Sequence, residues 1–251
     1  MFKSLSLKVI IFGFIFTFFS SFGQSFFIGL FNSSIRETLS ISHGQFGTIY
    51  ASATLCSSLL VIWIGKKIDD VNVLKFAIFV TILLSFSSFF FSKISSVVFL
   101  FVAIFLMRFS GQGMMSHTAS TTISRYFTKS RGRALSMIWF GLSSAEFILP
   151  VLIVYSLTLM AWQNIWIIIS ISVLIILPLA SYFLVKDIKL DTREIDHDAK
   201  FKEYKIKQWK RIEVLGDYRF YIISLNMLAM PWIATGVFVY QSFIVNSKGW
   251  G

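Results

Sequence analysis

Seven long apolar runs follow one another along the chain, and short polar turns or one long charged stretch separate them. They lie at roughly residues 9–31, 44–64, 74–92, 97–120, 133–157, 163–185 and 219–245. Each run can cross about 30 Å of hydrocarbon as a helix that rises about 1.5 Å per residue. None shows the two-residue alternation of a barrel strand. Because a chain in lipid must satisfy its own backbone hydrogen bonds, the pattern predicts an all-α membrane protein with seven transmembrane helices.

The composition agrees with a membrane location. Of 251 residues, 56% are apolar and 14% are charged, whereas a soluble domain has about 25% charged residues. A soluble enzyme is therefore excluded. The lone cysteine, Cys56, cannot form an intrachain disulfide, and no histidines or acids have metal-ligand spacing on one helix face. We therefore expect neither a metal nor a cofactor.

The net charge of +11 is distributed unevenly between alternate loops. Nineteen lysines and arginines lie on the side of the amino terminus and of residues 186–218, and only Arg36, Lys93 and Lys248 lie on the other. By the positive-inside rule, we expect a multi-pass protein of the inner (plasma) membrane with a cytoplasmic amino terminus and Gly251 outside. The charge is thus a topology signal, and no nucleic-acid partner is expected.

The charged stretch 186–218 also contains apolar residues at approximately helical spacing. These are Phe201, Tyr204, Trp209, Ile212 and Leu215. Such a pattern predicts an amphipathic helix on the inner membrane face. The alternative is a solvated linker.

A weak internal repeat relates the first and fourth apolar runs. The residues FGQSFF at 22–27 align with SGQGMM at 110–115, and an arginine follows each motif, Arg36 or Arg125. Because these two spans run in opposite directions, the repeat indicates three spans inverted against three, which is typical of secondary transporters.

Two charges remain near the bilayer midplane once loops and span ends are set aside. Arg108 lies in the fourth span and Glu146 in the fifth. A midplane charge is costly, so it normally faces a partner or a wet cavity, and these two are each other's obvious partner. Gln112 lies one turn from Arg108, and Pro150 leaves the carbonyl of Glu146 without its helical donor.

Two interpretations of this pair stay open. It is either a structural ion pair that fixes helix packing, or a device for proton-linked handling of a small anion. In the second case Glu146 holds Arg108 in the empty protein and takes a proton when a substrate carboxylate replaces it. Ser116 and His117 invite a hydrolase interpretation, but no nucleophile elbow accompanies them, so no enzyme is expected. We interpret His117 as a packing histidine.

Three motifs carry a resemblance to a known family. The residues GKKIDD at 65–70 stand between spans two and three, RFSGQG at 108–113 stands in span four, and RGRA at 131–134 enters span five. With the topology, they resemble the amino-terminal half of a major facilitator superfamily transporter, followed by its central loop and the first helix of the second half. The resemblance implies a gating loop at Gly65 and Asp69, although Asp70 and Asn72 depart from the usual motif. For Arg108 it implies a role in proton coupling.

Within that superfamily, Gly23-Gln24, Trp162, Thr235-Gly236 and Gln241 look most like the monocarboxylate and oxalate/formate branch. The resemblance implies that Gln24, Arg108, Gln112 and Gln241 face a central cavity. Glu146 joins this set because of its depth. Each glutamine could instead form an interhelical hydrogen bond.

The sequence thus predicts a six-helix half at residues 1–185, a cytoplasmic loop at 186–218 and the first helix of a truncated second half at 219–251, from a transporter of about twelve spans. We expect a secondary transporter that works by alternating access and carries a small organic anion with protons across the lipid bilayer. The alternatives are an anion exchanger or facilitator with a structural Arg108–Glu146 pair, and a non-transporting receptor or scaffold.

Overall fold

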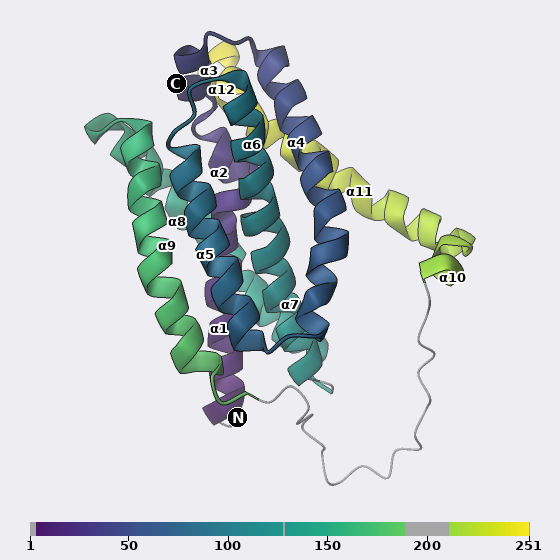
Figure 1. Cartoon of the computed structure of the whole chain (residues 1–251). Helices are drawn as coiled ribbons and strands as arrows, with labels where there is room; N and C mark the ends of the chain where they lie inside the picture. The colour runs from purple at the N-terminus through teal and green to yellow at the C-terminus, as the bar shows by residue number, and fades with distance from the viewer. Residues whose placement is uncertain (1–3, 128, 189–210, 251) are drawn as a thin grey trace, which may run out of the picture.

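A computed structural model describes residues 4–127, 129–188 and 211–250, and all the regular structure in this part of the chain is helical. Seven helical segments in it are long and apolar enough to cross a membrane, which confirms the predicted number. The first six form an upright bundle, and the seventh leaves it obliquely (Figure 1). In chain order the spans comprise α1 (Ser4–Ser20), η1 (Ser21–Gly23) and α2 (Ser25–Gly29); α4 (His43–Ile64) and η2 (Gly65–Asp69); α5 (Val73–Phe91); α6 (Val97–Met107), η3 (Arg108–Met115) and α7 (Ser116–Tyr126); α8 (Arg131–Leu159); α9 (Trp162–Val185); and α11 (Tyr218–Val239).

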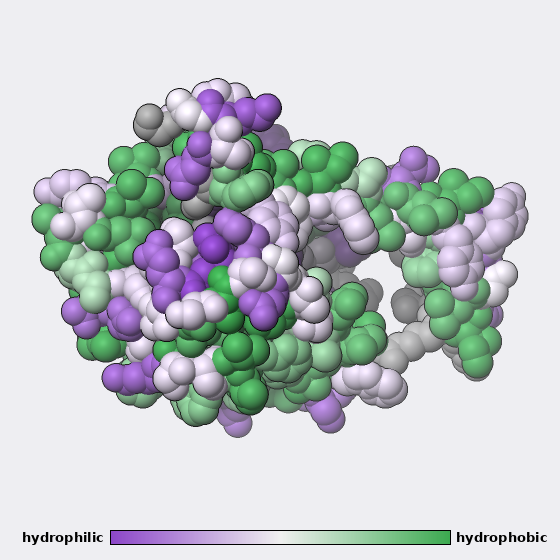
Figure 2. Space-filling model, turned by 90° about the horizontal axis from the view of Figure 1, so that it is seen from above, coloured by the Kyte–Doolittle hydropathy of each residue, from purple (hydrophilic) through white to green (hydrophobic). Residues whose placement is uncertain are grey.

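Among the described residues, three short helices lie outside the spans: α3 (Asn32–Leu39), α10 (Arg211–Leu215) and α12 (Gln241–Lys248). In Figure 1, α3 and α12 lie together at the upper end of the bundle. Figure 2 views that end from above and shows hydrophilic side chains gathered in its middle, with hydrophobic side chains common around its sides. This distribution suits a bundle that presents its ends to water and its sides to lipid.

Helix packing places the first and fourth spans at the centre of the bundle. Span one packs along α8, span four packs against both span one and α4, and α5 packs along α9. A cluster of buried aromatic rings joins α9 to α2 and α5. The ring centroid of Trp166 in α9 lies 5.5 Å from that of Phe27 in α2 and 4.3 Å from that of Phe91 in α5. The two central spans are therefore held on several sides.

Both central spans depart from regular α-helix, which the sequence analysis did not predict. Gln24 has extended backbone angles (φ −83°, ψ 157°) and separates η1 from α2. In span four, η3 is a π-helical segment, a form that is frequent at functional sites. The two irregular regions meet, since a Cβ added to Gly23 would lie 2.8 Å from the Cα of Gly111. The glycines that the internal repeat aligned are thus neighbours in space.

The structure describes the helix around Pro150 in full and the predicted amphipathic helix only in part. Helix α8 contains Pro150 and continues through it from Arg131 to Leu159. Of the predicted amphipathic helix, residues 201–209 lie outside the described residues, and Ile212 and Leu215 are exposed on the short helix α10.

Candidate functional site

Arg108 is the first residue of η3 and is buried, with 4% of its surface exposed. Its Nη1 donates to the carbonyl oxygen of Gly23 at 3.0 Å and to Oγ of Ser25 at 3.3 Å. The guanidinium also lies over the ring of Tyr50, at 5.4 Å from the centroid. Its Nε is buried and has no hydrogen-bond partner. The cation is thus held by groups of span one and α4, and its Nε keeps unused hydrogen-bonding capacity.

Glu146 is not the partner of Arg108, so the predicted pairing is wrong. Glu146 is exposed on α8, and no ion pair joins it to Arg108 in the described part of the chain. Helix α8 packs along α1 rather than along η3. The break at Gln24 provides the alternative partner, because Gly23 lies at the end of η1 and its carbonyl accepts from Arg108. The exchange in which Glu146 holds the empty Arg108 therefore does not apply.

A cavity of about 300 Å³ lies beside Arg108, between α4 and η3. Five of its seven lining residues carry a hydroxyl, amide or guanidinium group, although most of the surface that the lining exposes is apolar: Thr54, Ser57, Ser58, Val61, Arg108, Gln112 and Gly113. Oγ1 of Thr54 is a second buried polar atom without a partner. A buried polar atom left unpaired costs free energy, and two residues of this lining, Arg108 and Thr54, each have one. None of these lining residues is acidic.

The hydroxyl groups of α4 are the part of this site that sequence reasoning missed. Small and hydroxylated residues in transmembrane spans commonly allow close helix contacts and so do not by themselves indicate a binding site. Tyr50, Thr54, Ser57 and Ser58 recur at intervals of four, three and one residues, which places them on one face of the helix. That stripe of hydroxyl groups on one face of the span is the signal that identifies this wall of the site.

The predicted glutamines have separate positions. Gln112 lines the cavity with Arg108. Gln24 is half-buried, and its backbone lies between the two residues that Arg108 contacts. Gln241 lies on α12 and its Nε2 donates to the carbonyl of Phe26 at 3.4 Å, which is the interhelical alternative. The structure thus joins Arg108 and Gln112 and places Gln241 and Glu146 elsewhere.

The predicted gating loop forms η2 and packs on span four. Nε2 of His117 lies 2.9 Å from the carbonyl oxygen of Gly65, and Nη1 of Arg125 donates to the carbonyl of Ile68 at 3.2 Å. His117 thus has the packing role expected of it. Asp69 ends η2, and its side chain lies outside what the structure describes.

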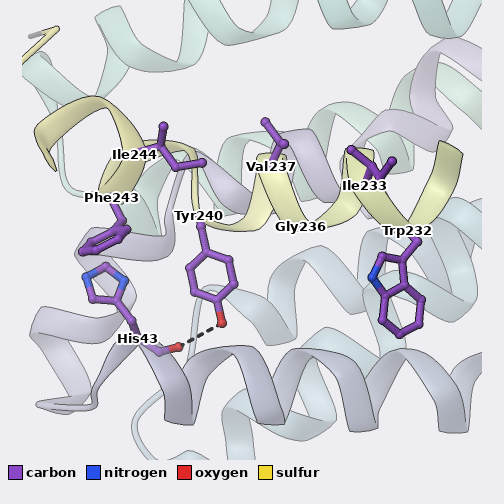
Figure 3. Close-up of a pocket in the computed structure, with 8 residues that line it drawn as sticks. All are labelled: His43, Trp232, Ile233, Gly236, Val237, Tyr240, Phe243 and Ile244. Carbon is purple, nitrogen blue, oxygen red and sulfur yellow. Dashed lines mark hydrogen bonds between the residues drawn. The ribbon is translucent and has the colours of Figure 1, made fainter. Parts of the chain in front are cut away.

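A second and larger cavity, of about 610 Å³, lies where α11 and α12 meet the start of α4 (Figure 3). Its lining is mostly apolar and aromatic, with His43 as its one imidazole: His43, Trp232, Ile233, Gly236, Val237, Tyr240, Phe243 and Ile244. The hydroxyl of Tyr240 donates to the carbonyl of His43 at 3.4 Å. No residue of the predicted site lines it, so the Arg108 cavity is the candidate site.

Comparison with known proteins agrees with this architecture. The family model of the Major Facilitator Superfamily matches residues 13–251. The chain belongs to the Major Facilitator Superfamily. This membership confirms the resemblance, and the expectation of a transporter-type protein rather than an enzyme agrees with it.

One solved structure shares the fold. It is a bacterial homolog of the human lysosomal transporter Spinster, in an inward-facing and unoccupied conformation, with a TM-score of 0.74 and 16% sequence identity. The match covers 98% of this chain and 56% of that chain, so this chain spans little more than half the length of its structural relative. No curated protein matches the sequence.

Proposed function

We propose that this superfamily chain acts in a secondary transporter that carries a small organic anion across the inner membrane by alternating access. Residues 1–185 contribute six spans of one half, residues 186–218 the cytoplasmic connection and residues 219–251 the first span of the other half. The amino terminus faces the cytoplasm. A monocarboxylate is the simplest substrate for a single guanidinium with free donors.

Arg108 is the observation that carries this proposal. A buried cation that no carboxylate neutralises is expensive in a membrane protein. The guanidinium has a buried Nε without a partner and borders a cavity lined by Gln112 and the hydroxyls of α4. A guanidinium fork matches the geometry of a carboxylate, as it does that of a phosphate group. An anionic substrate would therefore supply the counter-charge that the described residues around Arg108 do not.

Coupling to protons is the finer part of the proposal. Apart from Asp69 at the end of η2, Glu146 is the only acid within the seven described spans, so it is the candidate protonation site. Because Glu146 does not contact Arg108, facilitated diffusion or anion exchange is a second candidate. A pH gradient distinguishes the two, since only a proton-coupled carrier accumulates the anion in response to it.

The test is uptake of labelled monocarboxylates, dicarboxylates and sugars by proteoliposomes that contain the protein in the full length encoded by its gene, with and without a pH gradient. We expect uptake of a monocarboxylate. The variant Arg108→Lys should lower this uptake by at least about tenfold, because lysine lacks the forked guanidinium and therefore forms fewer hydrogen bonds to a carboxylate. Arg219→Lys, which changes an exposed arginine, is the matched control. Absence of uptake for every anion would refute the proposed substrate class.

A further inference from the structure

Arg108 contacts both sides of the break in span one. We propose that it braces a hinge at Gln24, and that Ser25 is the positioning residue that couples Arg108 to span seven. This inference rests on the proposed function, in which an anion binds to Arg108. According to this inference, binding at Arg108 changes the position of α11, the first span of the other half.

The first step is the geometry of the hinge. Gly23 is the last residue of η1, Gln24 is extended, and Ser25 is the first residue of α2. A single nitrogen, Nη1 of Arg108, donates to Gly23 at 3.0 Å and to Ser25 at 3.3 Å. Because one atom holds a residue on each side of Gln24, the angle between η1 and α2 depends on where the guanidinium lies.

The second step is the set of partners of Ser25. Its hydroxyl accepts from Arg108 and from the hydroxyl of Tyr50, the latter at 3.0 Å, and donates to Oγ1 of Thr235 at 3.4 Å. A serine hydroxyl has one donor and two acceptor positions, so all three are in use. Arg108, α4 and α11 thus meet at this one side chain.

The third step is that α2 and the end of α11 move as one unit. The backbone carbonyl of Phe238 lies so close to Gly29 that any side chain at this position would clash with it. The ring centroids of Phe26 and Phe238 are 6.1 Å apart. Just beyond α2, the buried Asn32 donates through Nδ2 to the carbonyl of Val239 at 2.5 Å. Because these contacts fix α2 and Asn32 against the end of α11, the two helices cannot slide past each other. A rotation of α2 therefore carries α11 with it.

Together these contacts define a two-state element. In the empty protein Arg108 holds Gly23 and Ser25, and the hinge is braced. An anion in the adjoining cavity draws the guanidinium toward itself through the donors that are free, and as Nη1 leaves Ser25 the brace is released. By reciprocity, weakening the brace must strengthen anion binding.

The experiment measures distances between spin labels on the full-length protein, with Cys56→Ser as background. One pair, Ser247→Cys on α12 and Val98→Cys on α6, reports on the moving unit. A reference pair, Val98→Cys and Thr158→Cys, lies within the bundle. The tested variant is Ser25→Ala, and its matched control is Ser21→Ala, which removes another buried serine hydroxyl of span one that has no partner.

In the empty protein we expect Ser25→Ala to lengthen or broaden the Ser247–Val98 distance while the reference pair and the Ser21→Ala variant stay unchanged. Lactate, used as the probe anion, should shift the unmutated protein in the same direction. Ser25→Ala should bind lactate about two- to tenfold more tightly, the worth of one hydrogen bond. Equal distances for Ser25→Ala and Ser21→Ala in the empty protein would overturn the brace. Lack of lactate binding would count against the proposed substrate instead, because the empty-state comparison needs no ligand.

Discussion

Gly23 and Gly111 show at the scale of single residues why the central spans lie so close. A Cβ on Gly23 would lie 2.5 Å from the backbone nitrogen of Gln112, and one on Gly111 would lie 2.7 Å from the Cα of Gly23. Real side chains essentially never approach so closely, so both positions require a residue without a side chain. The approach also sets the position of Arg108, three residues before Gly111, against the carbonyl of Gly23.

The variant Gly23→Ala should therefore destabilise the protein. Its methyl group meets backbone atoms that cannot move aside, and overpacking of this kind costs about 1–3 kcal/mol. Thermal unfolding in detergent measures the effect as a lower melting temperature. Gly132→Ala is the control, since a Cβ there would have no neighbour within 4 Å. Equal melting temperatures for the two variants would show that the central spans separate easily.

At this scale the sequence identifies Arg108 but not its partner. A lone arginine in an apolar run is conspicuous, because placing its charge inside the membrane costs free energy. The partner predicted from residue types was Glu146, the one carboxylate expected near the same depth in the membrane. The actual acceptor is a backbone carbonyl at a helix break, and a carbonyl is present at every residue. Residue identity therefore cannot reveal it.

At the scale of helices, span positions follow from the lengths of the apolar runs, and breaks within the spans do not. Run length is sufficient because, in lipid, an apolar run of this length without the alternation of a barrel strand satisfies its backbone hydrogen bonds only as a helix. By contrast, the extended Gln24 and the π-helical η3 depend on contacts between spans one and four. The sequence shows the motifs around Gln24 and η3 as a repeat. Only the structure shows that the two motifs contact each other.

The pairing of α5 with α9 gives a prediction at this scale. Ser85 and Ser170 donate to each other's backbone carbonyls, at 2.9 Å and 2.8 Å, and both are buried. The variant Ser85→Ala should lower stability by about 0.6 kcal/mol and by no more than about 1.7 kcal/mol, as measured for interhelical hydrogen bonds in membranes. Unfolding in mixed micelles would measure this. Ser136→Ala is the control, because Ser136 bonds only within its own exposed helix face; a loss above 3 kcal/mol for Ser85→Ala would imply a different role.

At the scale of the whole molecule, the charge distribution and the fold give independent information. The fold specifies which loops lie at the same end of the bundle, but it does not specify which end faces the cytoplasm. The distribution of basic residues, nineteen at one end and three at the other, predicts that orientation, because basic loops are retained in the cytoplasm. The net charge of +11, which in a soluble chain would indicate an acidic partner, here predicts the orientation in the membrane.

Two single-cysteine variants test this orientation in a Cys56→Ser background. Lys67→Cys lies in η2, on the side of the amino terminus, and Lys93→Cys lies between α5 and α6, at the opposite end of the bundle. Both lysines are exposed, so each new thiol should react with a maleimide that reaches it. A membrane-impermeant maleimide added to intact cells should label Lys93→Cys and leave Lys67→Cys unlabelled, whereas both should react after the membrane is permeabilised. The opposite labelling pattern would place η2 outside, and the gating loop proposed at Gly65 and Asp69 would then face the wrong side of the membrane.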